Sequence, residues 1–224
     1  MPQRSQIVME PRKSPVQARS TASVDAILEA TIQVLLSEGK ERLTTTKVAL
    51  RAGVSIGTLY QYFPNKSSLL QAALKRHMVE VAEAVDVVCK EQTGKTLREM
   101  ATALITAFLK AKMRDAKTSV ALYSVSADVD GVRIVQQLGG RINKAIVRML
   151  ATSSEALTTD PQLVASMLQG AMAGVSRRIL ESSAPEKQFD ILHRELIVMV
   201  SAYLDAGVAR GSVQEWPKTG SDSG

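Results

Sequence analysis

The stretch from residue 44 to residue 66 most constrains the fold, because it signals two short helices with almost no loop between them. Thr44 and Ser55 are N-cap residues, whose hydroxyl oxygens accept hydrogen bonds from amides of a first helical turn. Gly53 ends the first helix, since glycine enters the left-handed conformation at little cost. Pro64 ends the second helix. This spacing predicts two helices joined by a glycine turn.

The second of these helices has an outward face that suits a nucleic acid. Its outward residues are Gly57, Thr58, Tyr60, Gln61 and Tyr62. Glycine lets the helix backbone approach DNA closely, and the tyrosine hydroxyls can bind phosphates. The amide of Gln61 can pair with N6 and N7 of adenine in the major groove. For Tyr60 the alternative of a core aromatic stays open, and Phe63 is expected to be core.

The same residues carry a family resemblance. The string Ala52-Gly-Val-Ser-Ile-Gly-Thr-Leu-Tyr-Gln-Tyr-Phe63, followed by Asn65-Lys66 and Leu69-Leu70, resembles the signature of TetR-type transcriptional regulators. This resemblance implies an all-α homodimer with an N-terminal three-helix helix-turn-helix DNA-binding domain and a C-terminal helical domain for ligand binding and dimerisation. Positions that match the family's DNA contacts are Thr45, Ser55, Gly57, Thr58, Tyr60, Gln61, Tyr62 and Lys66.

Two residues depart from the family pattern. Leu50 occupies a site that is usually polar, which leaves open whether that face of the first motif helix is solvated. Ser68 stands where the family often has glutamate. We therefore expect that the reciprocal capping box between Asn65 and residue 68 is lost.

Positive charge gathers with the motif. The chain has a net charge of +6; residues 1–80 hold 11 Lys or Arg against 6 Asp or Glu, whereas residues 81–224 hold 17 against 16. A polyanion explains this asymmetry best, and a double-stranded DNA operator is the expected partner. Residues 1–19 are expected to be a disordered basic arm that adds phosphate contacts or only solubility.

Other classes of function lack their chemistry. The two histidines, His77 and His193, have no neighbouring Cys, Glu or Asp at metal-ligand spacing on an apolar face, and no catalytic serine elbow or phosphate-binding loop is present. We expect no enzyme, no cofactor and no metal site. Cys89 is the only cysteine, which excludes an internal disulfide and suits the cytoplasm. We find no apolar run long enough for a membrane span.

Helical periodicity continues to the end of the chain. It predicts helices over 20–37, from Pro64 to about Val88, and over 95–113, 116–127, 129–152, 160–182 and 187–208, about nine with the motif helices. The expected parts are a DNA-binding domain over 20–75, an effector-binding and dimerisation domain over 76–210, and a flexible tail over 211–224. The pair Gly139-Gly140 is expected to break or kink its helix.

The second domain should carry the dimer interface and the effector pocket. The last two predicted helices are amphipathic, and paired with a copy of themselves they would form a four-helix bundle. Ordinary intramolecular core explains about half of their apolar residues. Our candidates for a pocket that binds a hydrophobic effector are Met100, Leu104, Phe108, Tyr123 and Met167, with core packing as the alternative for each.

The expected function is a sequence-specific transcriptional regulator, a ligand-responsive repressor that binds a palindromic operator as a homodimer. The ligand would act through the linker-free helix that follows Pro64 and joins the domains. The alternative is a helix-turn-helix architectural DNA-binding protein without a small-molecule effector.

Overall fold

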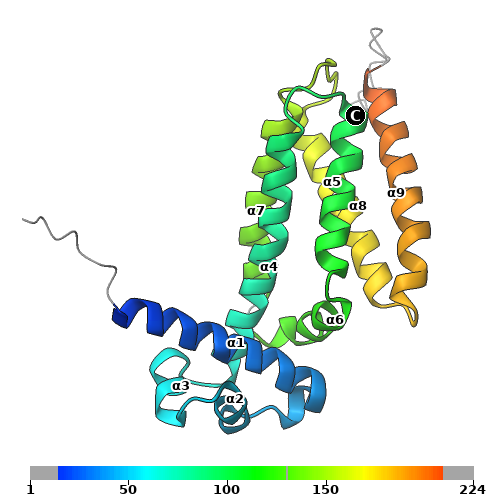
Figure 1. The fold of residues 1–224 in the computed structure, drawn as a ribbon. Coiled ribbons are helices and arrows are strands. Elements are labelled where there is room, and N and C mark those ends of the chain that lie inside the picture. Colours follow the sequence, from blue (N-terminus) through cyan, green and yellow to red (C-terminus); the bar gives the residue numbers. More distant parts are fainter. Residues whose placement is uncertain (1–14, 130, 209–224) are drawn as a thin grey trace, which may run out of the picture. The chain divides into compact units, whose positions relative to one another are not determined.

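The computed structural model describes residues 15–129 and 131–208 of the 224-residue chain, and over these residues the fold is all-α (Figure 1). The described residues form α1 (Pro15–Arg42), α2 (Thr45–Ala52), α3 (Ile56–Tyr62), α4 (Lys66–Glu91), α5 (Leu97–Met113), α6 (Ala116–Val125), the 3-10 turn η1 (Ser126–Asp128), α7 (Gly131–Leu150), α8 (Pro161–Leu180) and α9 (Pro185–Val208). The predicted fold class is confirmed, and each expected helix is present within a few residues of its predicted bounds.

The helices gather into two compact units. The first takes in the chain up to Arg76 together with Ala121–Gly131, and the second takes in His77–Val120 and the chain from Val132 onward. Ala121–Gly131 was expected in the second domain. It joins the first unit because Leu122, Val125 and Val129 bury their side chains and the Gln71 amide donates a hydrogen bond to the Val129 carbonyl at 3.1 Å.

The first unit packs α1, α2 and α3 around a small apolar core. The core includes Ile27, Val34, Leu43, Val48, Leu59 and Leu69. Helix α1 begins at Pro15, so residues 15–19 are helical rather than disordered; residues 1–14 and the predicted tail lie outside the described residues. Gly39 has non-helical φ of 78° and ψ of 169°, so α1 is kinked there, near its predicted end. Helical residues continue after the kink to Arg42.

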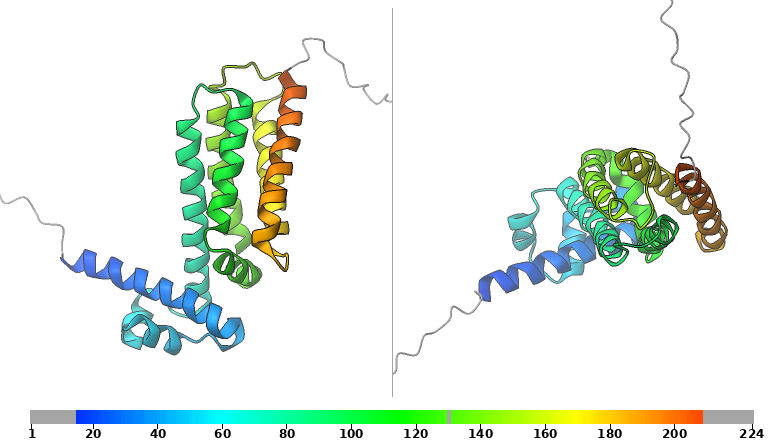
Figure 2. Two further views of the ribbon diagram at one scale, coloured as in Figure 1. Left: turned by 45° about the vertical axis from the view of Figure 1, so that its right-hand side comes forward. Right: turned by 90° about the horizontal axis from the view of Figure 1, so that it is seen from above.

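The second unit is a bundle of long helices in which α5 packs on α8 and α9, and α8 packs on α9 (Figure 2). Its core includes Met100, Leu104, Ile105, Ile146, Leu168 and Leu196. Helix α7 runs unbroken through Gly139 and Gly140, so the expected break is absent. A Cβ at Gly139 would lie 3.0 Å from the Gln169 amide nitrogen, which donates to the Gly139 carbonyl at 2.9 Å. The glycine therefore lets α8 approach closely.

Among the described helices, we find none with the length and the apolar content that a membrane crossing requires.

Candidate nucleic-acid interface

The caps of the two motif helices form as the sequence predicts. Thr44 is extended, with φ of −130° and ψ of 154°, and its hydroxyl accepts from the Lys47 amide at 3.3 Å. Gly53 adopts the left-handed conformation with φ of 67°, which turns the chain after α2. The Ser55 hydroxyl accepts from the Thr58 amide at 3.0 Å. The path of the chain from α2 into α3 is therefore fixed by local hydrogen bonds.

Two buried side chains hold α3 in the first unit. Leu59 is fully buried, and Phe63 is 8% exposed, which confirms its predicted core role. On α2, Val48 and Ala49 are buried as well. Leu50 points away from this core and is 82% exposed, so its face of α2 is solvated despite the apolar side chain.

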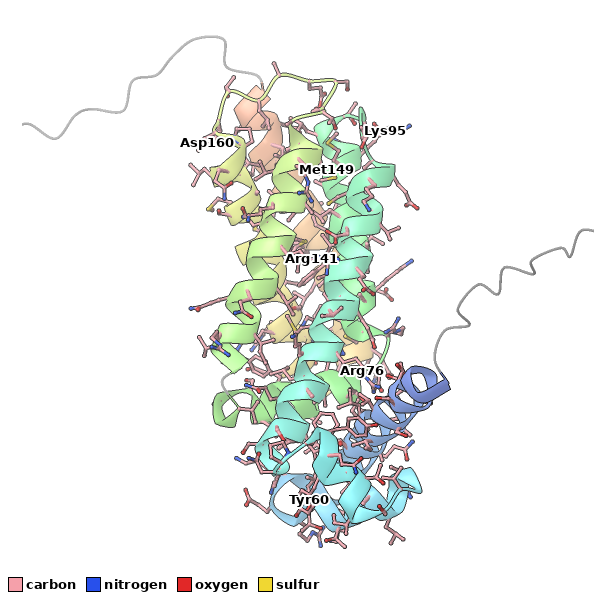
Figure 3. All side chains as sticks on the ribbon, turned by 90° about the vertical axis from the view of Figure 1, so that its left-hand side faces the viewer. Tyr60, Arg76, Lys95, Arg141, Met149 and Asp160 are labelled. Atoms are coloured by element: carbon pink, nitrogen blue, oxygen red, sulfur yellow. The ribbon has the colours of Figure 1, made fainter. Side chains whose placement is uncertain are left out.

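The outward face of α3 is exposed and partly braced. Gly57 and Gln61 are exposed, while Thr58 and Tyr62 are half-buried. The Tyr60 ring, labelled in Figure 3, is 50% exposed, so Tyr60 is not a core aromatic. Its hydroxyl lies 3.1 Å from the Thr45 hydroxyl of α2. This hydrogen bond links two of the predicted DNA-contact residues across the motif.

Lys66 has a partner within the fold. Its ammonium group donates to the Lys40 carbonyl near the end of α1. Lys47 makes a similar contact: its ammonium donates to the Arg42 carbonyl at 3.1 Å and also pairs with the Glu38 carboxylate. Cations at a helix C-terminus stabilise the free carbonyls there. Lys66 therefore stabilises the end of α1 within the first unit, and its contact with DNA stays a prediction.

The capping box before α4 is present, so the prediction of its loss was wrong. The Ser68 amide donates to the Asn65 side-chain oxygen at 2.9 Å, and the Ser68 hydroxyl accepts from the Asn65 amide at 3.2 Å. The same hydroxyl donates to the Asn65 carbonyl at 2.7 Å. The short serine side chain reaches back to the cap residue as glutamate does in the usual box.

Two glycines of the motif should respond oppositely to alanine. Gly53→Ala places a side chain at positive φ and should lower the free energy of unfolding by about 1–2 kcal/mol. Gly57→Ala meets only the Ser55 hydroxyl at 3.7 Å and should raise it by roughly 0.5 kcal/mol, while weakening DNA binding by holding the backbone away. Urea denaturation and fluorescence anisotropy measure the two effects. Equal losses of unfolding free energy in the two variants would contradict the left-handed conformation of Gly53 and the open space beside Gly57.

Three of the five candidate ligand residues lie together in one core. Met100, Leu104 and Phe108 are buried in the core of the second unit, because their spacing of four follows the inner stripe of α5. Met167 is 54% exposed on α8. Tyr123 is 47% exposed and belongs to the first unit. The structure therefore brings Met100, Leu104 and Phe108 together, and an effector pocket lined by the five residues stays a prediction.

The two histidines are held by hydroxyl groups. His193 lies 2.9 Å from the Thr106 hydroxyl and stacks on Phe189 with ring centroids 5.5 Å apart. The His77 Nε2 atom lies 3.0 Å from the Ser119 hydroxyl, which itself donates to the Lys112 carbonyl at 2.7 Å. Nε2 of His77 therefore carries the proton. Within the described ranges, no three His, Cys, Asp or Glu side chains are grouped as metal ligands.

His77 should make stability depend on pH. Burial, then the charges of Lys112 and Arg114, lowers its pKa to about 4 from 6.5, with Asp115 acting in the opposite direction. As pH falls from 6.5 to 4, His77 becomes protonated in the unfolded chain but stays neutral in the folded chain. We expect a loss of about 3 kcal/mol in unfolding free energy across this window.

The measurement is urea denaturation at several pH values, with His77→Gln as the comparison. The loss in the original chain should exceed the loss in the variant, since other titrating groups are common to both. Parallel pH profiles would show that His77 is not the source.

Comparison with known proteins gives consistent matches. A family model described as bacterial regulatory proteins of the tetR family matches residues 27–73, and one described as a tetracyclin repressor-like C-terminal domain matches residues 96–204. The HTH-type transcriptional repressor KstR of Rhodococcus jostii is 31% identical over 144 residues, which cover 63% of this chain and 65% of that protein. KstR of Mycobacterium tuberculosis is 28% identical over 76% of this chain and 79% of its own length.

A solved structure has the same fold. A transcriptional regulator of the TetR family from Mesorhizobium loti aligns with a TM-score of 0.71, at 20% identity, over 84% of this chain and 98% of its own. Such a match covers both units of the chain.

Proposed function

The chain belongs to the TetR family of bacterial regulatory proteins, and on this premise we propose that it is a ligand-responsive repressor that binds a palindromic DNA operator as a homodimer. The α3 face carries the proposal: Gly57 and Gln61 are exposed there, and Tyr60 is braced by Thr45. A helix presented in this way can enter the major groove. The KstR relatives are repressors by name, which favours repression over activation.

The exposed apolar residues of α8 and α9 support a homodimer. Leu163 and Met167 on α8, and Ile191, Val198 and Met199 on α9, are each more than half exposed, at 52–58%. Gly170 and Gly174 leave open space beside α8, which permits close helix approach. A stable dimer buries roughly 1,200 Å² or more, and two helices per subunit can supply that area. We name this exposed face of α8 and α9 the α8–α9 face.

Helix α4 is the element through which a ligand would act. It is one helix over Lys66–Glu91, and it supplies residues to both units, with the division after Arg76. A ligand that binds the second unit and shifts α4 would change the spacing of the two α3 helices in a dimer. A coupling of about 1–3 kcal/mol corresponds to a 5- to 150-fold change in operator affinity.

Gln61 is the residue proposed to read a base. Gln61→Ala should relax the preference at one base-pair position by about 1–3 kcal/mol, because a bidentate pair to adenine is lost. Binding selection from a randomised operator library measures the preference at every position. Gln136→Ala, an exposed glutamine of α7 outside the α8–α9 face, is the matched control and should leave all preferences unchanged. Identical preferences in both variants would remove Gln61 from base recognition.

Selection of bound fragments from the source genome tests the proposed function as a whole. Purified protein should enrich a two-fold-symmetric site whose half-sites lie about 34 Å apart, the spacing of two recognition helices. A chain that retains no duplex DNA at low ionic strength would overturn the proposal.

The alternative is a helix-turn-helix DNA-binding protein without a small-molecule effector. One relative is not a transcriptional repressor by name: the nucleoid occlusion factor SlmA of Escherichia fergusonii is 24% identical over 69% of this chain and 82% of that protein. An architectural role predicts that no small molecule changes DNA affinity. A thermal-shift screen with small hydrophobic compounds, followed by anisotropy with the selected operator, separates the two functions.

A further inference from the structure

The exposed side of α7 carries positive charge and no carboxylate. Arg133, Arg141, Lys144 and Arg148 are exposed on this helix, and α7 contains no Asp or Glu. The opposite side of α7 is buried in the core of the second unit. Protein surfaces usually mix charges of both signs, so this side of α7 indicates an anionic partner.

Two adjoining hollows lie along α7, one between α7 and α4 and the other lined by α7 residues alone. Figure 3 shows α4 and α7 side by side, with Arg141 and Met149 labelled. One, of about 200 Å³, has Cys89, Ala145 and Met149 among its lining. The other, of about 470 Å³, is polar and includes Gln137, Gly140 and Lys144. Arg148 lines both hollows and therefore joins them. We name the two together the α4–α7 groove.

The groove holds positive charge that the fold does not neutralise. Arg141 donates from Nε to the Asp86 carboxylate at 2.8 Å, so these two charges offset each other. Lys90, Lys144 and Arg148 make no ion pair among the described side chains. Burial and the neighbouring Asp86 raise the pKa of the Cys89 thiol to about 12, so the thiol adds no negative charge.

We propose that the α4–α7 groove binds an amphipathic organic anion, whose phosphate or carboxylate head is held by Lys144 and Arg148 and whose short apolar body lies against Ala145 and Met149. Arginine matches the planar geometry of these heads with paired hydrogen bonds. Ligand sites typically join an apolar lining to a few convergent polar groups, in a volume of about 300–1,000 Å³. This inference rests on the proposed function, because it names the charge and the site of the effector.

Asp86 argues for a small ligand over a nucleic acid. The Asp86 side chain lines the same hollow as Cys89 and Met149, and it is 18% exposed. A continuous phosphate backbone along the groove would bring repeated negative charge against it, whereas a single head at Lys144 and Arg148 avoids it. A ligand in the groove would also touch α4, the helix that continues into the first unit.

The test is calorimetric titration of the full chain with octyl phosphate at low ionic strength and below micelle formation. We expect saturable binding of octyl phosphate and no binding of octylammonium, which has the same tail and the opposite charge. Inorganic phosphate should bind at least tenfold more weakly, since it lacks the apolar body. Octanoate in place of octyl phosphate separates a carboxylate preference from a phosphate preference.

Two variants and a control locate the site. Arg148→Gln and Lys144→Gln should each weaken octyl phosphate binding about tenfold or more, because each removes a charge-assisted hydrogen bond. Lys110→Gln, an exposed lysine of α5 outside the groove, should leave the affinity unchanged. Circular dichroism checks that all three variants are folded. Equal affinity in the original chain and Arg148→Gln would overturn the site, as would binding of octylammonium or of a polyglutamate peptide in preference to octyl phosphate.

A second readout separates this inference from the proposed function. The titration contains no DNA. A chain that binds octyl phosphate but no duplex DNA would contradict the repressor proposal and support the groove site. A chain that binds its operator but not octyl phosphate would contradict the groove site and support DNA binding. Where both occur, octyl phosphate should change operator affinity at least fivefold in the original chain and not in Arg148→Gln.

Discussion

Val198→Asp should produce a folded monomer whose affinity for a two-site operator is about 10²- to 10⁴-fold weaker than that of the original chain. Val198 is 58% exposed on the α8–α9 face. Burying an unpaired carboxylate in a symmetric interface is strongly unfavourable, and the two-fold axis brings in both copies. Loss of the dimer also removes the second DNA-binding unit, so the avidity of paired half-sites disappears.

Light scattering at micromolar concentration and anisotropy with full and half operators measure these two effects. Half-operator affinity should be unchanged, because the first unit is untouched. Val132→Asp is the matched control: Val132 is 66% exposed on α7, away from α8 and α9 in the sequence. A dimer mass for Val198→Asp, or a monomer mass for Val132→Asp, would refute the α8–α9 face as the interface.

Leu59→Ala should destabilise the DNA-binding unit by about 2–5 kcal/mol, the range for a buried leucine cut to alanine. Leu59 is fully buried and is the side chain that seats α3. Leu50→Ala makes the same chemical change on the neighbouring helix at a residue that is 82% exposed. We expect less than about 0.5 kcal/mol there.

Hydrogen exchange of the α2 and α3 amides isolates this unit from the rest of the chain, because it reports local opening. Exchange should accelerate by the factor that matches the lost free energy in Leu59→Ala and stay unchanged in Leu50→Ala. DNA affinity should fall in Leu59→Ala in proportion to the fraction of unfolded α3. Similar exchange in the two variants would show that α3 is not anchored by Leu59.

Local features were predictable where the groups involved lie within four residues of one another. The caps at Thr44 and Ser55 and the left-handed Gly53 are such cases, and they form as predicted. The capping box before α4 was missed because the expectation rested on glutamate, while the Ser68 hydroxyl is close enough to satisfy the Asn65 amide. Short range alone therefore did not guarantee a correct prediction.

Contacts between distant residues were not predictable. The bond from Lys66 to the Lys40 carbonyl spans 26 residues, and that from Tyr60 to Thr45 spans 15. Neither contact follows from the helix pattern. Periodicity tells which side of a helix a residue lies on, but not which distant group that side chain meets.

The sequence by itself determined the helices, the caps at Thr44, Gly53 and Ser55 and the family, because helix signals and the motif involve residues close together in the chain. Only the tertiary structure decided which apolar stripes are core and which stay exposed. Met100 and Met167 both fit helical stripes, yet one is buried and the other is half exposed. The physical reason is that a helical period fixes a face, whereas burial depends on which distant helix covers that face.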